Sequence, residues 1–132
     1  MKLSIIAFAL ALSLTACKKE TAEHAVKSAS VEQVDKWIAA NECTAVDANN
    51  PGTREKMGVV PGAIKLSSHD KYDVGELPAD KSRRLIFYCA NTQCGASHDA
   101  AARALTAGYT DVEVMPDGIA GWVNAGKKVD KI

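Results

Sequence analysis

The sequence lacks an excess of charge, a basic run and any internal repeat. Its 16 Lys and Arg balance 16 Asp and Glu over 132 residues, and no more than two basic residues stand side by side. Nucleic-acid-binding domains usually gather Lys and Arg on one face, so the charge pattern indicates neither a nucleic-acid nor a membrane-surface partner. Without repeats or low-complexity segments, the length fits one globular domain.

The chain also lacks a hydrophobic run long enough to span a membrane. Its N-terminal apolar segment, residues 3–16, holds 14 residues, three of them with hydroxyl side chains. A bilayer core needs about 20 residues. Lys2 precedes the segment and Cys17 follows it directly. A basic residue before a short apolar stretch is typical of a secretory signal peptide, which is removed from the mature protein.

The end of this segment, LTAC at residues 14–17, resembles the bacterial lipobox. The resemblance implies that residues 1–16 are removed and that Cys17 becomes a lipidated N-terminus. Lys18 at the second mature position resembles the pattern for outer-membrane sorting. We therefore expect a bacterial cell-envelope protein that faces the periplasm and touches the outer membrane through its lipid alone. The alternative is an ordinary secretory signal followed by an accidental cysteine.

Residues 17–29 are mostly polar or small and have no hydrophobic face, which predicts a flexible tether rather than structure. The folded domain is then expected at residues 30–132, as a monomer. Removing Lys2 with the signal peptide leaves 15 basic against 16 acidic residues, a net charge near −1.

Apolar runs of strand length alternate with helical patterns along the predicted domain. Ser30 and Gln33 form a capping-box pattern at the start of the first helix, and Asn41 is suited to end it. The expected strands are residues 43–47, 63–66, 85–89 and 111–115; the expected helices are residues 30–41, a single turn at 54–58, a helix ending at Gly108 and residues 119–126. This alternation predicts an α/β fold, with a small parallel sheet and helices on both faces.

Cys89 ends the strongest strand pattern, LIFYC at residues 85–89. Open parallel sheets bind ligands beyond the carboxyl ends of their strands. A loop that leads into a helix there directs amide N–H groups and the positive end of the helix dipole at one point, which favours a thiolate. We predict that Cys89 is a nucleophile; the alternative is a buried, inert cysteine. The surrounding loop comprises Ala90, Asn91, Thr92, Gln93, Cys94 and Gly95.

Three cysteines remain after the signal peptide: Cys43, Cys89 and Cys94. An odd number cannot pair completely within one chain. Cys94 is a candidate resolving thiol, which would attack an oxidised or sulfur-carrying Cys89 and close a disulfide. Alternatively, Cys94 packs the loop or pairs with Cys43, although Cys43 is expected in the core.

Two further residues are candidates for supporting roles. His98 follows Ser97, the expected N-cap of the next helix. Its imidazole would hold a proton near Cys89, or alternatively face solvent as first-turn side chains usually do. Asp47 ends the expected strand 43–47, at the same edge of the sheet as Cys89.

Four stretches, in this order, resemble the rhodanese-like family: AVDAN at residues 45–49, GVVPGAIKL at 58–66, LIFYC at 85–89 and GYTDVEVMPDGIAGWVNAG at 108–126. The resemblance covers nearly all of the mature chain. It implies the rhodanese-like fold and a sulfurtransferase whose nucleophile, Cys89, carries a persulfide, with no cofactor and no metal. It also implies that Asp47 holds loop backbone rather than moving protons.

The sequence departs from the family pattern at its loop. The segment CANTQCGAS, residues 89–97, contains no basic residue, and Asn49 and Val59 stand where the family usually has Arg and His. Without a cation, thiosulfate and phosphate esters are expected to be poor substrates.

We therefore expect sulfur transfer or thiol redox exchange, with a small sulfur donor or a protein thiol acceptor as partner. The alternatives are a non-catalytic binding module and a dithiol redox element formed by Cys89 and Cys94.

Overall fold

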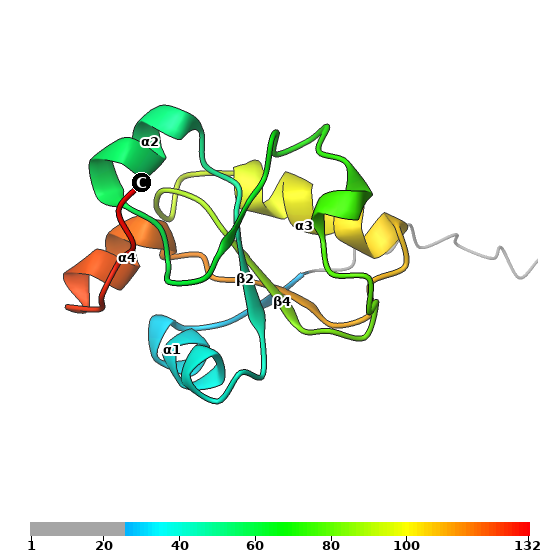
Figure 1. Cartoon of the computed structure of the whole chain (residues 1–132), viewed down its shortest axis with the longest axis horizontal. Helices are drawn as coiled ribbons and strands as arrows, with labels where there is room; N and C mark the ends of the chain where they lie inside the picture. Colours follow the sequence, from blue (N-terminus) through cyan, green and yellow to red (C-terminus); the bar gives the residue numbers. More distant parts are fainter. Residues whose placement is uncertain (1–25) are drawn as a thin grey trace, which may run out of the picture.

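The computed structural model describes residues 26–132. The predicted signal peptide, Cys17 and most of the predicted tether lie outside the described residues. Five parallel strands form one sheet in the order β1-β5-β4-β2-β3 (Figure 1). The strands are β1 (Lys27–Ser28), β2 (Thr44–Asp47), β3 (Ile64–Lys65), β4 (Leu85–Tyr88) and β5 (Val112–Val114). The predicted α/β fold with a small parallel sheet is confirmed.

Helices cover both faces of this sheet. They are α1 (Val31–Ala39), α2 (Pro51–Met57), α3 (Ala96–Thr106) and α4 (Gly118–Asn124), with a short 3-10 turn at Val74–Glu76. One core cluster joins α3 to the segment around Tyr72 and Leu77, and the other joins α1 to α4 through side chains such as Val34 and Trp122. In Figure 1, α1 and α3 accordingly lie on opposite sides of β2 and β4.

The ends of α1 follow the sequence signals closely. The Ser30 hydroxyl accepts from the Gln33 amide at 3.2 Å, and the Gln33 side chain accepts from the Ser30 amide at 2.9 Å. Asn41, just past the helix, has a φ of 54°, in the left-handed region that asparagine tolerates. The capping box and the helix stop are confirmed.

The N-terminal boundary of the folded part differs from the prediction. Lys27 and Ser28 pair with Glu113 and Val114 of β5, and the Ala29 amide donates to the Val114 carbonyl at 2.8 Å. The last residues of the predicted tether therefore form an edge strand. Two residues are too few to show a strand periodicity, so the sequence alone does not predict this pairing with β5.

The helix α2 begins earlier than the expected turn at residues 54–58. Asn50 caps it by accepting from the Thr53 amide at 2.9 Å, and Pro51 occupies the first turn. Proline is well suited to that position because its missing N–H has no intrahelical partner there. The segment ANNPGT was expected to be loop, but its second half begins a helix.

Among residues 26–132, the helices are all too short or too polar to cross a membrane. The same residues contain no cluster of three His, Cys, Asp or Glu side chains suited to a metal ion.

Candidate functional site

Cys89 lies directly after β4, at the carboxyl edge of the sheet, and is 1% exposed. The first turn of α4 holds its backbone. The Cys89 carbonyl accepts from the Ile119 amide at 2.8 Å, and the Ala90 carbonyl accepts from the Ala120 amide at 2.9 Å. Two segments about thirty positions apart therefore fix the start of the loop.

Gly118 permits this close approach. Its φ is 62°, and a Cβ at this position would lie 2.6 Å from the Cys89 carbonyl oxygen and 2.7 Å from the Ala90 carbonyl carbon. Real Cβ atoms do not approach backbone this closely, and the left-handed conformation itself favours glycine. The loop that begins at Cys89 therefore depends on a glycine from another element.

The loop turns back on itself to bring Cys94 to Cys89. The Cys94 amide donates to the Asn91 carbonyl at 3.1 Å, and the Gln93 amide donates to Asn91 Oδ1 at 3.0 Å. This Asx-type turn is a local structure that asparagine forms readily. The two cysteines form a disulfide, with their Cα atoms 6.3 Å apart.

Cys43 is the one free cysteine of the described residues. Its side chain is buried in the cluster with Val34 and Trp122, as expected for a core residue. Burial raises the pKa of the Cys43 thiol to about 11, against a lowering effect of Arg83 and Arg84. The thiol is therefore neutral at physiological pH.

Ser97 contacts the sulfur of Cys89, a position that the sequence did not indicate. Its hydroxyl oxygen lies 3.4 Å from Cys89 Sγ, and the residue is 2% exposed. The predicted role of Ser97 as N-cap is wrong, because α3 begins at Ala96 and its N-cap is Gly95, without a side-chain hydrogen bond. One residue inside the helix, the Ser97 side chain turns toward Cys89 instead. A correct helix start would have been needed to find it.

His98 does not reach the cysteine pair through any hydrogen bond. Its side chain is exposed, and it forms no hydrogen bond or ion pair within residues 26–132. Its backbone amide donates to the Gly95 carbonyl at 3.1 Å, as part of the first turn of α3. Of the two positions considered for His98, the structure has the solvent-facing one.

Asp47 is fully buried and holds the neighbouring strand end by several hydrogen bonds. Its Oδ1 accepts from the Asn49 amide at 2.7 Å and from Arg54 Nε at 3.1 Å, and its Oδ2 accepts from the Tyr88 hydroxyl at 2.7 Å. Burial, together with the Asp47 charge, raises the pKa of Tyr88 far above its usual range, so the hydroxyl remains a donor. These contacts match the structural role implied for Asp47.

Arg54 pairs with the Asp47 carboxylate and also holds the backbone around it. From α2, its Nη2 donates to the carbonyl oxygens of Asp47 at 3.0 Å and Leu66 at 2.9 Å. Arg54 is 7% exposed, so its charge is used within the fold rather than in the loop. Asn49 is also buried, and its side-chain nitrogen has no hydrogen-bond partner among the described residues.

The electrostatics of the cysteine loop come from backbone groups. The residues from Cys89 to Ser97 include no basic side chain. The amides of Gly95, Ala96 and Ser97 donate to no acceptor within residues 26–132, as is usual at the start of a helix. They lie at the N-terminus of α3, an 11-residue helix whose dipole is positive at this end. The helix dipole therefore favours negative charge at this end of α3.

A pocket of about 260 Å³ borders this loop. Asn91 and Thr92 line it from the loop, and Asp117, Ala120, Gly121 and Asn124 line it from the α4 side. Asp117 is exposed, and it is the only charged residue in the lining. Small substrates that approach the loop from this side meet a polar, negatively charged surface.

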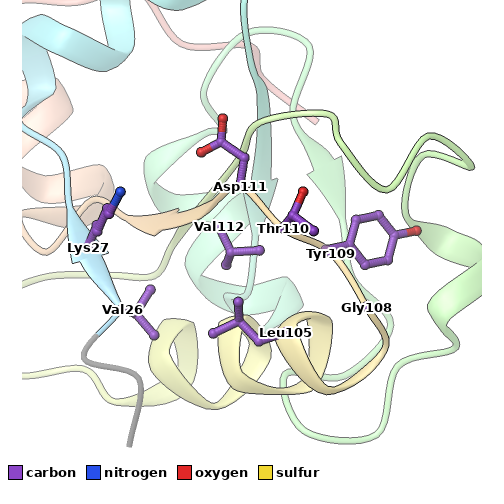
Figure 2. A pocket seen from close by; sticks show the side chains of 8 residues that line it. All are labelled: Val26, Lys27, Leu105, Gly108, Tyr109, Thr110, Asp111 and Val112. Atoms are coloured by element: carbon purple, nitrogen blue, oxygen red, sulfur yellow. The ribbon is translucent and has the colours of Figure 1, made fainter. Parts of the chain in front are cut away.

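A larger pocket, of about 450 Å³, lies at the opposite edge of the sheet. Figure 2 shows Val26, Leu105 and Val112 gathered at its floor, with Lys27 and Asp111 beside them. Val112 begins β5, whereas Cys89 follows the carboxyl end of β4. This pocket therefore does not belong to the cysteine site.

Comparison with known proteins agrees with this arrangement. A family model of the rhodanese-like domain matches residues 30–125. No curated protein matches the chain.

Solved structures share the fold. The BH2092 protein from Bacillus halodurans superposes with a TM-score of 0.70 at 19% identity, covering 80% of this chain and 77% of that one. A possible tyrosine phosphatase of unknown function from Rhodopseudomonas palustris gives 0.66 at 20% identity, covering 81% and 86%. A thiosulfate sulfurtransferase from Pseudomonas aeruginosa gives 0.67 at 26% identity, covering 83% of this chain but only 21% of its own length.

Proposed function

Because this chain belongs to the rhodanese-like family, we propose that it is a thiol-dependent sulfurtransferase in which Cys89 carries the sulfur and Cys94 resolves it. The observation that carries the proposal is the disulfide between Cys89 and Cys94, within one loop at the carboxyl edge of the sheet. Cys89 supplies the family's nucleophile position, and Cys94 supplies a second thiol within bonding distance.

The reaction has two steps. The Cys89 thiolate takes a sulfane sulfur atom from a donor and becomes a persulfide, Cys89–S–SH. Cys94 then attacks Cys89 Sγ, the Cys89–Cys94 bond forms, and the terminal sulfur leaves as hydrogen sulfide with the Cys94 proton. The two thiol-level cysteines are oxidised to a disulfide while the sulfane sulfur is reduced. An external thiol must reopen the disulfide before the next cycle.

The local electrostatics support a persulfide rather than a doubly charged substrate. The Ser97 hydroxyl offers a hydrogen bond to one sulfur anion, and the N-terminal end of α3 favours negative charge. Thiosulfate or a phosphate ester would normally require an Arg or Lys opposite its oxygens, and the loop has neither. We propose a low-charge sulfane donor or a protein persulfide as the sulfur source. We therefore propose neither thiosulfate nor phosphate esters as substrates of this chain.

Intact-mass analysis of the reduced protein tests the proposal. With a polysulfide donor, Cys94→Ser should retain the mass of one added sulfur on Cys89, because nothing resolves the persulfide. The wild-type protein should instead release sulfide and lose two hydrogen atoms as the disulfide closes. Cys43→Ser is the matched control and should behave like wild type. Absence of any sulfur adduct in Cys94→Ser would contradict sulfur transfer.

A dithiol redox element is the second candidate, favoured by the same disulfide. In that case Cys89 and Cys94 exchange electrons with a protein dithiol and never carry sulfur. Two results together indicate dithiol exchange: oxidation of the pair by a small-molecule disulfide, and no sulfur adduct on Cys94→Ser after treatment with polysulfide. A partner-binding function that survives in Cys89→Ser would instead indicate the non-catalytic module.

We also propose that the mature protein is tethered in the bacterial envelope through lipidated Cys17. The proposal is supported by the lipobox-like LTAC segment and by Lys18. Labelling with an alkyne fatty acid should mark the wild-type protein and not Cys17→Ser. A cleaved but unlabelled wild-type protein would favour the ordinary secretory signal.

A further inference from the structure

We infer that an external thiol opens the Cys89–Cys94 disulfide by attacking Cys94, that Cys89 is the leaving thiolate, and that Asp117 favours neutral or cationic thiols over anionic ones. The inference rests on the proposed function in one respect, that the pair opens and closes during turnover. It is tested without a sulfur donor, so its failure and the failure of sulfur transfer are distinguishable.

Access decides which sulfur is attacked. A thiolate attacks a disulfide in line with the S–S bond, so the target sulfur must be open on the side away from its partner. Cys89 is 1% exposed, and the Ser97 hydroxyl packs against its Sγ at 3.4 Å. Cys94 is partly exposed, on a loop whose neighbouring residues 91–93 are exposed. Only the Cys94 side of the bond is accessible to a thiol from solvent.

The leaving group points to the same direction of attack. A disulfide breaks faster when the departing thiolate is the more stable one. A departing Cys89 thiolate can accept from the Ser97 hydroxyl and faces the N-terminal end of α3. Among residues 26–132 no donor contacts Cys94 Sγ, whereas Cys89 Sγ contacts the Ser97 hydroxyl at 3.4 Å and the Cys94 carbonyl oxygen at 3.3 Å. Cys89 is therefore the better leaving group of the two.

The bonds balance without a further reagent. The incoming thiolate forms a mixed disulfide with Cys94, and the bonding pair of the broken S–S bond departs on Cys89. A second thiol then attacks the sulfur of the incoming group, which forms an external disulfide and releases Cys94 as the leaving thiolate, so both cysteines are free. Cys89 thus becomes a thiolate, ready to accept sulfur, in the first step.

The pocket beside the loop gives the class of thiol. Asn91 and Thr92 belong to both the pocket and the loop that holds Cys94, and the Cys94 amide is bonded to the Asn91 carbonyl. The one charged group of the lining is the exposed Asp117 carboxylate. A thiol approaching Cys94 past this pocket is therefore repelled if it is anionic and attracted if it carries an ammonium group.

Mapping of the trapped intermediate tests the point of attack. The oxidised protein is mixed with 2-mercaptoethanol, quenched with acid after short times, and alkylated. Cleavage after Arg84 and Arg103 releases one peptide that contains both cysteines, and its fragmentation locates each group. We expect the mercaptoethanol adduct on Cys94 and the alkyl group on Cys89. An adduct mainly on Cys89, or equally on both, would overturn the inference.

Ser97 acts as a positioning residue in this step, and its test includes a spectroscopic signature. Loss of its hydroxyl in Ser97→Ala should slow opening roughly tenfold, as expected for one hydrogen bond to a charged group. The ultraviolet absorbance of the Cys89 thiolate should then appear at higher pH than in wild type. Ser97→Thr keeps a hydroxyl and should restore most of both properties. Unchanged opening and an unchanged thiolate profile in Ser97→Ala would refute this role.

A series of thiols tests the charge preference. Opening rates with cysteamine, 2-mercaptoethanol and 2-mercaptoethanesulfonate are each divided by the rate of the same thiol with a small-molecule disulfide. Asp117→Asn should raise the anionic rate relative to the cationic rate by about 2–5-fold at low salt, and the effect should fade at high salt. Glu55→Gln, an exposed acid on α2, is the control and should leave the ratio unchanged. If Asp117→Asn keeps the wild-type ratio, Asp117 does not set the preference for neutral or cationic thiols.

Discussion

Single atoms decide how the cysteine loop is held, and Gly118 is the clearest case. A Cβ at Gly118 would meet the carbonyl of Cys89 at 2.6 Å, whereas one at Gly126, with a similar φ of 75°, would meet nothing within 4 Å. Both Gly→Ala variants lose the left-handed freedom of glycine, at about 1–2 kcal/mol. We expect Gly118→Ala to lose about 1–3 kcal/mol more in urea unfolding, because backbone must also move. Equal losses would show that the clash is relieved without cost.

The buried Asp47–Arg54 pair predicts a large effect from one substitution. Arg54→Met removes the cation and leaves the Asp47 carboxylate buried with only neutral donors. Breaking one half of a buried pair typically costs about 3–5 kcal/mol of unfolding free energy. Arg84→Met is the comparison, because Arg84 pairs with the half-exposed Asp111; it should cost about 1 kcal/mol or less. Similar losses in the two variants would contradict a stabilising role specific to Arg54.

The raised pKa of Cys43 predicts which thiols react in the reduced protein. With a folded-state pKa of about 11 and an ordinary value of 9.0, the folded protein resists ionising Cys43. Its contribution to stability is therefore complete below pH 9 and is lost as the pH rises through about 11. At pH 8, iodoacetamide should modify the partly exposed Cys94 of the native reduced protein but reach Cys43 only in urea. Rapid labelling of Cys43 in the native protein would contradict its burial.

At the scale of elements, the edge strand β1 makes its own prediction. Val26 packs against the core cluster that contains Leu85 and Phe87, and Lys27 and Ser28 extend the sheet beside β5. A chain that starts at residue 30 should lose about 1–3 kcal/mol of unfolding free energy against one that starts at residue 26, measured with urea. Equal stability of the two chains would show that residues 26–29 do not stabilise the fold, as expected for the tether predicted from the sequence.

Elements with a strong local sequence pattern were predicted correctly. Very short elements, and contacts between residues far apart in the chain, were not predicted. The apolar run LIFYC and the Ser30–Gln33 capping box act within a few residues, so the sequence alone reveals β4 and the start of α1. The pairing of β1 needs β5, far along the chain. Arg54 reaches Asp47 only because α2 folds back over the strand end. The position of Cys89 directly after β4 is predicted from the apolar run alone. The direction of the Ser97 side chain is not, because it depends on whether α3 begins at residue 96 or one residue later.

At the scale of the whole molecule, the disulfide couples the stability of the fold to the redox state of its site. It closes a short loop with a sequence separation of 5, and the chain-entropy estimate for a loop of this size is about 2 kcal/mol. We therefore expect the oxidised protein to unfold at higher urea concentration than the reduced protein, by about this free energy. Cys94→Ser should unfold alike with and without reductant, whereas Cys43→Ser should keep the full difference.

Reduction should lower the stability of the domain without unfolding it. Hydrogen bonds of Ile119, Ala120 and Asn91 already hold the loop in the folded state, so the loop gains little freedom when the disulfide opens. Loss of the native circular dichroism spectrum on reduction alone would contradict this, and would leave no folded, reduced state for sulfur transfer to use.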